Sequence, residues 1–320
     1  MEPVLVTGAT GLIGSNICKV LLERGHAVRA LVRPGSEMGP LATLGVELVE
    51  GDIRHRADVK RAVLGTSAVI NSAALLGGPD QERGASYATN YEGSISCYYA
   101  GRPRRVVELV TSTFFNHDTT LREDAELANE FADDPYTLSK GAAYVEAKRL
   151  IEEGDDIVFV QPGGTFGPSP TPNRALSFTF NSVLLGAIRG QITEYLGFPG
   201  PWVRAEDVAR CAVAALEIGE RGDMYLAFGR EEARPLTDFL NQACEIAGVD
   251  HRVAEIRVSS ENEGDVKQYG ETVVALAERE WPTPWFDNSR TREVLDYRPV
   301  DLRSALEETV AWLRELGEIS

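Results

Sequence analysis

Residues 3–14 read PVLVTGATGLIG and join a short apolar run to three glycines at the spacing G-x-x-G-x-x-G. Residues 4–6 predict a buried parallel strand. After the glycines, apolar residues recur at helical spacing, which predicts a helix with one apolar face: Ile13, Ile17, Val20 and Leu21. A strand, a glycine turn and a helix in this order are typical of a dinucleotide-binding site. A glycine turn without a ligand is the alternative.

Each glycine has a distinct expected role in this turn. Gly8 permits the tight turn itself, and Gly11 lets backbone N–H groups approach a pyrophosphate at the positive end of the helix. Gly14 lets the helix pack close to the strand. The cofactor contacts expected in this segment are Gly8, Thr10, Gly11, Leu12, Ile13 and Gly14.

Length and composition narrow the function classes. The chain has 320 residues, enough for one large α/β domain with an appended lobe. Its net charge of -17 argues against nucleic acid or a membrane surface as a partner, and no apolar run is long enough to span a bilayer. The first expected strand starts at residue 3, which leaves no room for a signal peptide.

The four cysteines are widely scattered, so neither a disulfide framework nor a zinc site is expected: Cys18, Cys97, Cys211 and Cys244. We therefore expect a reduced, soluble, cytoplasmic protein.

The octapeptide TGATGLIG resembles the start of the extended short-chain dehydrogenases/reductases. That family includes nucleotide-sugar epimerases, 4,6-dehydratases and dihydroflavonol-reductase-like carbonyl reductases, and the chain is most similar to the last group. The resemblance covers essentially the whole chain and is strongest in residues 3–170.

The family resemblance and the alternation of strand and helix signals imply the same α/β fold class. We expect a Rossmann-type doubly wound parallel sheet with a smaller C-terminal substrate lobe. Residues 1–165 would form the dinucleotide-binding domain and residues 166–320 mainly the substrate lobe. Segments around residues 203–228 would return to the Rossmann domain.

The end of the second expected strand, residues 26–32, bears on the choice of cofactor. Proteins that bind NAD usually carry a carboxylate there, but this chain has Val32 followed by Arg33. Arginine pairs bidentately with a 2′-phosphate, and Ser36 would add a hydroxyl. A surface arginine stacked on adenine is the alternative. The sequence thus favours NADP, with NAD as the second choice.

The next two strands are each followed by a segment that resembles a cofactor contact of the family. Asp52, with Ile53, matches G-D-[IVL] and would accept a hydrogen bond from the adenine amino group; capping a helix near His55 is an alternative role. Small residues after the fourth strand would let the chain pass beneath the cofactor, and contacts with it are expected at Ala73 and Ala74.

Two further segments match family motifs. Asn90 begins N-Y-E-G-S, which resembles N-V-x-G-T and implies that Asn90 helps to hold the catalytic lysine or its water; bonding only to local backbone is the alternative. Residues 161–168 (QPGGTFGP) resemble R-P-x-x-V-Y-G-P, a loop that borders the nicotinamide. Contacts are expected there at Pro162 and Thr165, unless the segment is only a turn.

Residues 133–140 (DDPYTLSK) carry the main catalytic signal. Asp134 suits a helix N-cap and Pro135 the first helical position. Tyr136 and Lys140 then lie four residues apart on one helix face. A lysine ammonium beside a phenol stabilises the phenolate, so that the tyrosine can exchange a proton near neutral pH.

The fifth expected strand, residues 105–110, ends in Thr111-Ser112-Thr113, and one of these hydroxyls would bind the substrate oxygen. The resemblance to T-S-[ST] favours Thr113 over Ser112, and both stay open.

A second pair, Tyr144 and Lys148, repeats the Tyr136–Lys140 spacing. We favour the first pair because Pro135 marks the helix start and lies at the family's distance from the fifth strand. The second pair is expected on a solvated or dimer-facing surface.

The segment after Thr113 bears on the type of reaction. Many nucleotide-sugar dehydratases have an Asp-Glu pair where this chain has Phe114 and Phe115, so dehydration is disfavoured. The expected function is an NAD(P)-dependent carbonyl reductase or alcohol dehydrogenase for a small molecule. The alternatives are a nucleotide-sugar epimerase with tightly bound NAD and a non-catalytic dinucleotide sensor. The resemblance also implies a homodimer through the helices that carry Asn90 and Tyr136.

Overall fold

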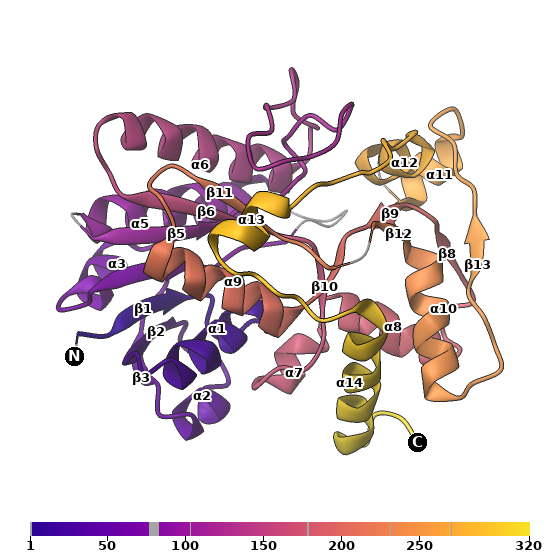
Figure 1. The fold of residues 1–320 in the computed structure, drawn as a ribbon, viewed down its shortest axis with the longest axis horizontal. Coiled ribbons are helices and arrows are strands. Elements are labelled where there is room, and N and C mark those ends of the chain that lie inside the picture. The colour runs from indigo at the N-terminus through magenta and orange to yellow at the C-terminus, as the bar shows by residue number, and fades with distance from the viewer. Residues whose placement is uncertain (1, 77–82, 103, 178, 231, 270) are drawn as a thin grey trace.

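The computed structural model describes residues 2–76, 83–102, 104–177, 179–230, 232–269 and 271–320 (Figure 1). Seven strands form its central sheet: β1 Val4–Thr7, β2 Val28–Val32, β3 Glu47–Glu50, β4 Ala68–Asn71, β5 Arg105–Leu109, β6 Ile157–Pro162 and β11 Met224–Ala227. Their order is β11-β6-β5-β4-β1-β2-β3, and every neighbouring pair is parallel. The expected Rossmann-type doubly wound sheet is confirmed.

Helices cover both faces of this sheet, because its strands are apolar on both sides. On one face lie α1 (Leu12–Glu23) and α9 (Ala205–Ile218), which share a core with alternate strand residues. The other face is covered by α3 (Arg56–Val63), α5 (Gly93–Gly101) and α6 (Pro135–Glu152). Figure 1 shows the two layers on opposite sides of the strands.

The turn between β1 and α1 requires glycine at two positions. Gly8 has a φ of 68°, in the left-handed region that favours glycine. A Cβ atom on Gly14 would lie 2.2 Å from the carbonyl oxygen of Gly8, so any side chain there would push the helix off the strand. The expected strand, turn and helix are confirmed, with Gly11 as the helix N-cap residue.

The two helices expected at the active site differ in local structure: one has a regular N-cap, and the other contains a π-helical stretch. α6 begins at Pro135, and the Asp134 side chain accepts a hydrogen bond of 2.9 Å from the Thr137 backbone N–H, as the sequence predicts. Asn90 lies in a π-helical stretch, η1 (Tyr87–Glu92), which follows α4 (Arg83–Ser86) and continues into α5. Such π-helical turns are frequent at functional sites.

A second lobe is built on α8 (Phe180–Ile188), α10 (Leu236–Ala247) and α14 (Leu302–Glu315). The remaining elements are α2 Gly39–Thr43, α7 Pro172–Ala175, α11 Glu263–Tyr269, α12 Glu271–Glu278, α13 Ser289–Val294, β7 Gly164–Phe166, β8 Glu194–Leu196, β9 Pro199–Gly200, β10 Trp202–Arg204, β12 Arg234–Pro235 and β13 Ala254–Ile256. In the described ranges, no helix combines the length and apolar character needed to cross a bilayer.

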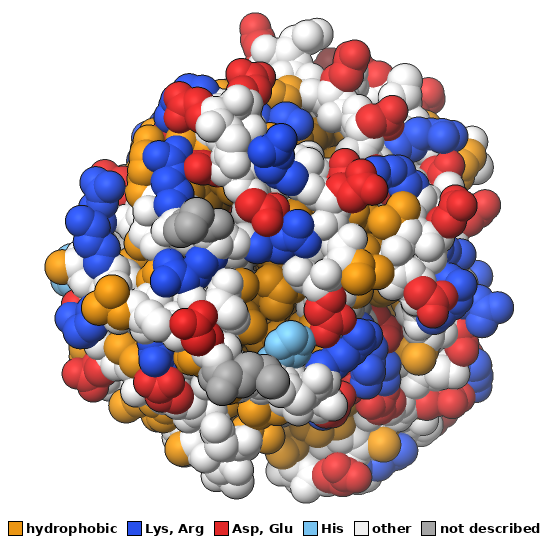
Figure 2. Space-filling view, turned by 60° about the vertical axis from the view of Figure 1, so that its left-hand side comes forward, with side chains coloured by type: hydrophobic (Ala, Val, Ile, Leu, Met, Phe, Trp, Pro, Cys, Tyr) orange, Lys and Arg blue, Asp and Glu red, His pale blue; other side chains and the backbone are white. Residues whose placement is uncertain are grey.

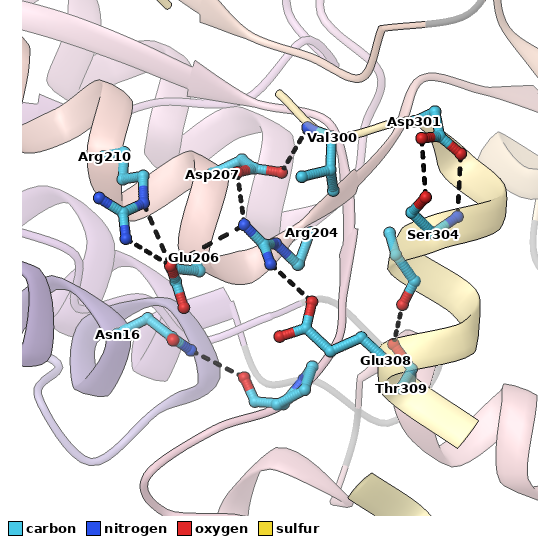
Figure 3. A network of polar contacts seen from close by, with 12 residues as sticks. Asn16, Arg204, Glu206, Asp207, Arg210, Val300, Asp301, Ser304, Glu308 and Thr309 are labelled. Atoms are coloured by element: carbon cyan, nitrogen blue, oxygen red, sulfur yellow. Dashed lines mark hydrogen bonds and ion pairs between the residues drawn. The ribbon is translucent and has the colours of Figure 1, made fainter. Parts of the chain in front are cut away.

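A partly buried polar network joins the two lobes (Figure 3). Asp207, in the first turn of α9, accepts a hydrogen bond of 2.9 Å from the Arg204 guanidinium and one of 3.2 Å from the Val300 backbone N–H. Arg204 also pairs with Glu308 of α14. The network therefore holds the C-terminal helix against the helix layer of the sheet.

The visible surface carries both signs of charge. On the face in Figure 2, acidic and basic side chains are interspersed, and hydrophobic side chains gather between them near the centre. This face has no continuous basic surface of the kind that binds a nucleic-acid backbone.

Candidate active site

The structure brings Lys140 to the carboxyl end of β5. Its ammonium donates hydrogen bonds of 2.6 Å to the backbone oxygen of Leu109 and 3.0 Å to a carboxylate oxygen of Glu108. Lys140 is 3 % exposed and Glu108 1 %, so this ion pair is fully buried. The catalytic lysine of the sequence prediction is therefore held by a carboxylate that the sequence analysis did not single out.

Three hydroxyl groups near this end of the sheet have no hydrogen-bond partner among the described residues. The Thr113 hydroxyl is buried and has no hydrogen-bond partner among the described residues. The Tyr136 side chain is half-buried, and its hydroxyl likewise has no partner in the described ranges. The Ser112 hydroxyl also has no hydrogen-bond partner among the described residues, so the choice between Thr113 and Ser112 stays open. Free hydroxyls at Thr113 and Tyr136 are what a substrate oxygen needs.

Asn90 ties the segment after β4 to α6. Its side chain donates to the backbone oxygen of Leu75 and to the Ser139 hydroxyl, each at 3.0 Å, and accepts from the Leu75 N–H at 2.7 Å. Neither Lys140 nor the backbone of its own helix is among these partners. Asn90 therefore contacts α6 at Ser139, the residue that precedes Lys140.

The second tyrosine of α6 does not lie on the surface, so that expectation is wrong for Tyr144. Its side chain is 8 % exposed and contacts the rings of Phe114, Phe115 and Phe159. Burial raises the pKa of Tyr144 above its ordinary value. Of the second pair, Tyr144 and Lys148, only Lys148 is exposed. The reason is the helix period, since Lys140, Tyr144 and Ala147 share the face that packs on the sheet.

A cavity of about 610 Å³ opens beside the glycine turn, and Thr10, Arg33, Ser36, Asp52, Arg54 and Arg174 are among its lining residues. It lies where a dinucleotide bound at the turn would place its adenosine end. Because Gly8 and Gly14 have no side chains, a ligand can approach the backbone of the turn closely. The residues present therefore fit a dinucleotide.

The arginines of this cavity differ in their partners. Arg54 is held by Asp52 at 2.6 Å, and this hydrogen bond lowers the pKa of the Asp52 carboxyl. The guanidinium groups of Arg33 and Arg174 have no hydrogen-bond or ion-pair partner among the described residues. Arg174 lies on α7, far from the turn in sequence, and no local motif signals it.

Asp52 does not cap the following helix, so that alternative is wrong. The N-cap residue of α3 is His55, and no side chain caps this helix. Asp52 instead lines the cavity, with its carboxylate bonded to the Arg54 side chain and backbone N–H. Ile53, beside it, is buried.

The other expected cofactor contacts lie along the same edge of the sheet. A Cβ atom on Gly8 would lie 2.7 Å from the Ala73 backbone nitrogen, so the segment with Ala73 and Ala74 runs directly beside the turn. Pro162 ends β6. Thr165 is buried in β7, where its hydroxyl donates to the Gly163 carbonyl oxygen at 2.9 Å.

The family model described as "NAD dependent epimerase/dehydratase family" matches residues 4–227 of this chain. The chain belongs to the NAD-dependent epimerase/dehydratase family.

Named members of the family match along almost their whole length. Sterol demethylase protein B of Methylococcus capsulatus is 27 % identical over 342 residues, which cover 98 % of this chain and 99 % of that protein. A dTDP-4-dehydro-6-deoxy-D-allose reductase of a Streptomyces species is 28 % identical over 97 % of this chain and 96 % of its own. The crystal structure of gox2253 is 26 % identical, with a TM-score of 0.84 and full coverage of both chains.

In this member of the family, residues 116–118 are NHD, and the histidine among them is buried. His117 is 6 % exposed and lies between Trp281 and Trp285, with ring centroids at 5.5 and 6.0 Å. Its Nε2 atom lies 2.9 Å from the Ser112 carbonyl oxygen. Burial lowers the pKa of His117 to about 4, so the ring is neutral at neutral pH and donates to Ser112.

The buried His117 predicts a loss of stability in mild acid. The imidazole takes up a proton near pH 6.5 in the unfolded chain but near pH 4 in the folded one. Between these values the unfolded state binds more protons, so stability falls as the pH drops from 6.5 to 4, by about 3 kcal/mol from this group. Urea unfolding across this range should show a shallower pH dependence in His117→Gln than in the natural protein.

The exposed His55 supplies the control for this measurement. His55 forms only a surface ion pair of 3.6 Å with Asp58, so His55→Gln should change the slope less than His117→Gln does. Equal slopes in the natural protein and in His117→Gln would show that His117 does not bind its proton this weakly.

Proposed function

We propose that the chain is an NADP-dependent carbonyl reductase or alcohol dehydrogenase that acts on a small molecule. The observation that carries the proposal is the arrangement at the end of β5. There the buried ammonium of Lys140 shares a helix face with Tyr136, and the Thr113 hydroxyl is buried without a partner among the described residues. The name of the relative from Streptomyces, a sugar reductase, supports reduction as the type of reaction.

The chain's own groups would handle the substrate oxygen. In reduction, the Thr113 hydroxyl would bind the carbonyl oxygen, and Tyr136 would give that oxygen its proton. Lys140 would hold the ribose and stabilise the phenolate that Tyr136 becomes. When bound, the nicotinamide supplies the hydride for the carbonyl carbon. In alcohol oxidation, Tyr136 would take the proton instead.

Dehydration fits these side chains less well. Phe114 and Phe115, at the positions of the dehydratase acid–base pair, are fully buried in the core around Tyr144. No carboxylate takes their place next to Thr113 in the sequence. Assembly into a homodimer through α5 and α6 stays a prediction; Val145 of α6 is exposed on that side of the molecule.

The choice of NADP rests on two cations that line the cavity and have no partners among the described residues. A 2′-phosphate is a dianion, and Arg33 and Arg174 would supply charge-assisted hydrogen bonds to it from two distant segments of the chain. Glu37, also at this cavity, is held by Asn173 at 2.9 Å. We therefore assign Arg33 as the first contact of the 2′-phosphate and Arg174 as the second.

The test is a set of dissociation constants for NADPH and NADH, measured by fluorescence, together with NADPH consumption on a panel of carbonyl compounds. NADPH should bind at least about tenfold more tightly than NADH, the size expected for one bidentate contact. Arg33→Ala should remove most of this preference and leave NADH binding nearly unchanged.

Arg257→Ala removes the same charge from an exposed position outside the cavity and serves as the control. It should change neither constant. A preference for NADH in the natural protein would show that Arg33 has been assigned wrongly.

A further inference from the structure

A row of polar side chains crosses the middle of the sheet and ends at Lys140. Thr7 of β1 pairs in register with Asn71 of β4, and Asn71 pairs in register with Glu108 of β5. All three side chains are buried. Because in-register neighbours of a parallel sheet point to the same face, they form one lateral line from the first strand to α6.

Hydrogen bonds connect every member of this row. The Thr7 hydroxyl donates to the Asn71 side-chain oxygen, and the Asn71 amide donates to a Glu108 carboxylate oxygen at 2.6 Å. Ser94 of α5 accepts from Asn71 at 2.9 Å and donates to the other Glu108 oxygen at 3.0 Å. That same oxygen accepts from Lys140. The carboxylate thus has three donors around it.

Glu108 and Lys140 are the two charges of this cluster. Cys97 and Tyr98 of α5 face the same carboxylate, and burial together with its negative charge raises the pKa of each above its ordinary value. Both therefore stay neutral in the working pH range. Tyr136 and Tyr144 are the other titratable groups described on this face of α6, and burial raises the pKa of Tyr144 above its ordinary value. A buried carboxylate without a cationic partner would be strongly unfavourable, so Glu108 and Lys140 depend on each other.

The geometry fixes two of the three N–H groups of the lysine. One is taken by the Leu109 carbonyl oxygen and one by Glu108, which leaves a single N–H for another partner. We propose that Glu108 is a positioning residue, which anchors the Lys140 ammonium so that this one N–H reaches the cofactor ribose while the positive charge stabilises the Tyr136 phenolate. The inference rests on the proposed function for the role of Lys140, and on the contacts above for the role of Glu108.

Two consequences separate positioning from mere packing. Without the carboxylate, the ammonium loses its anchor, so the dissociation constant for NADPH should rise. An ammonium that is no longer anchored also stabilises the Tyr136 phenolate less. The pH midpoint of alcohol oxidation, which needs the phenolate, should therefore move to higher pH.

The experiment compares Glu108→Gln with Ser94→Ala, which removes a hydrogen bond to the same carboxylate but leaves the ion pair intact. Glu108→Gln should weaken NADPH binding about tenfold, the size of one strong contact, and raise the pH midpoint by about one unit. Glu108→Asp, which retains the charge, should keep the midpoint of the natural protein. Ser94→Ala should change neither quantity. If Glu108→Gln behaves like Ser94→Ala, Glu108 only packs the core and the inference is wrong.

A stability measurement keeps the inference testable if Glu108→Gln folds poorly. The double variant Glu108→Gln/Lys140→Met removes both charges, and its urea midpoint should lie above the value expected from adding the two single losses. Additive losses would show that the two residues do not depend on each other. The stability measurement and the NADPH dissociation constant can both be obtained without turnover. If the natural protein reduces no carbonyl compound, the proposed function is wrong, but these two measurements still test the role of Glu108.

Discussion

Replacing Tyr136 by Phe is expected to lower kcat by about 10²–10⁴-fold, the usual contribution of proton transfer from a positioned side chain. The substitution keeps the ring and its packing and removes only the hydroxyl, which has no partner among the described residues. NADPH binding should stay nearly unchanged, because this hydroxyl is not proposed to hold the cofactor. Stopped-flow or steady-state NADPH absorbance with a carbonyl substrate measures the change.

Tyr144→Phe is the matched control, since it removes the same hydroxyl from a tyrosine about two helical turns further along. Tyr144 packs against Phe114, Phe115 and Phe159, and phenylalanine fits those contacts equally well. Its turnover should stay within about twofold of the natural protein. If Tyr144→Phe is inactive and Tyr136→Phe is active, the two tyrosines have been assigned to the wrong roles. If both are fully active, the chain does not use this chemistry.

Asp207→Ala should destabilise the protein by about 3 kcal/mol, because it breaks a buried ion pair and leaves Arg204 without one of its carboxylate partners. Asp207 is 2 % exposed, and its carboxylate accepts from Arg204 and from the Val300 backbone N–H. The loss should be at the lower end of the range for such pairs, since Arg204 still has Glu308. Urea unfolding at neutral pH measures it.

Asp301→Ala, which removes another side chain drawn in Figure 3, shows how much stability is lost when only a helix cap is removed. Asp301 accepts a hydrogen bond of 2.9 Å from the Ser304 backbone N–H at the start of α14. Its loss should cost about 1 kcal/mol. If Asp207→Ala lowers the free energy of unfolding by no more than Asp301→Ala does, the contact between the lobes does not depend on this ion pair.

The sequence was most informative where local chemistry dictates the backbone. The glycine turn after β1 and the start of α6 at Pro135 were both predicted, because a positive φ, a close helix–strand contact and an N-cap each need particular residue types. Spacing along α6 placed Tyr136 and Lys140 on one face, but the same period also buries Tyr144, which the sequence analysis assigned to the surface.

The rest depended on contacts between distant parts of the chain. Glu108 meets Lys140 only because β5 and α6 pack together, although a carboxylate within the apolar run of residues 106–110 was a visible signal. Arg174 reaches the cavity from α7 of the second half, and no motif in its own segment indicates a ligand. Such pairings follow from topology rather than from residue patterns.

The cavity beside the glycine turn has walls from both halves of the protein, since Thr10 and Arg33 precede β3 and Arg174 follows β7. The same boundary is crossed by hydrogen bonds from Thr171 to the Thr10 carbonyl oxygen and from Asn16 to the Pro168 carbonyl oxygen. A molecule bound there would touch both halves. By thermodynamic linkage, part of its binding free energy would then oppose their separation, so saturation with ligand would add to the cohesion of the fold.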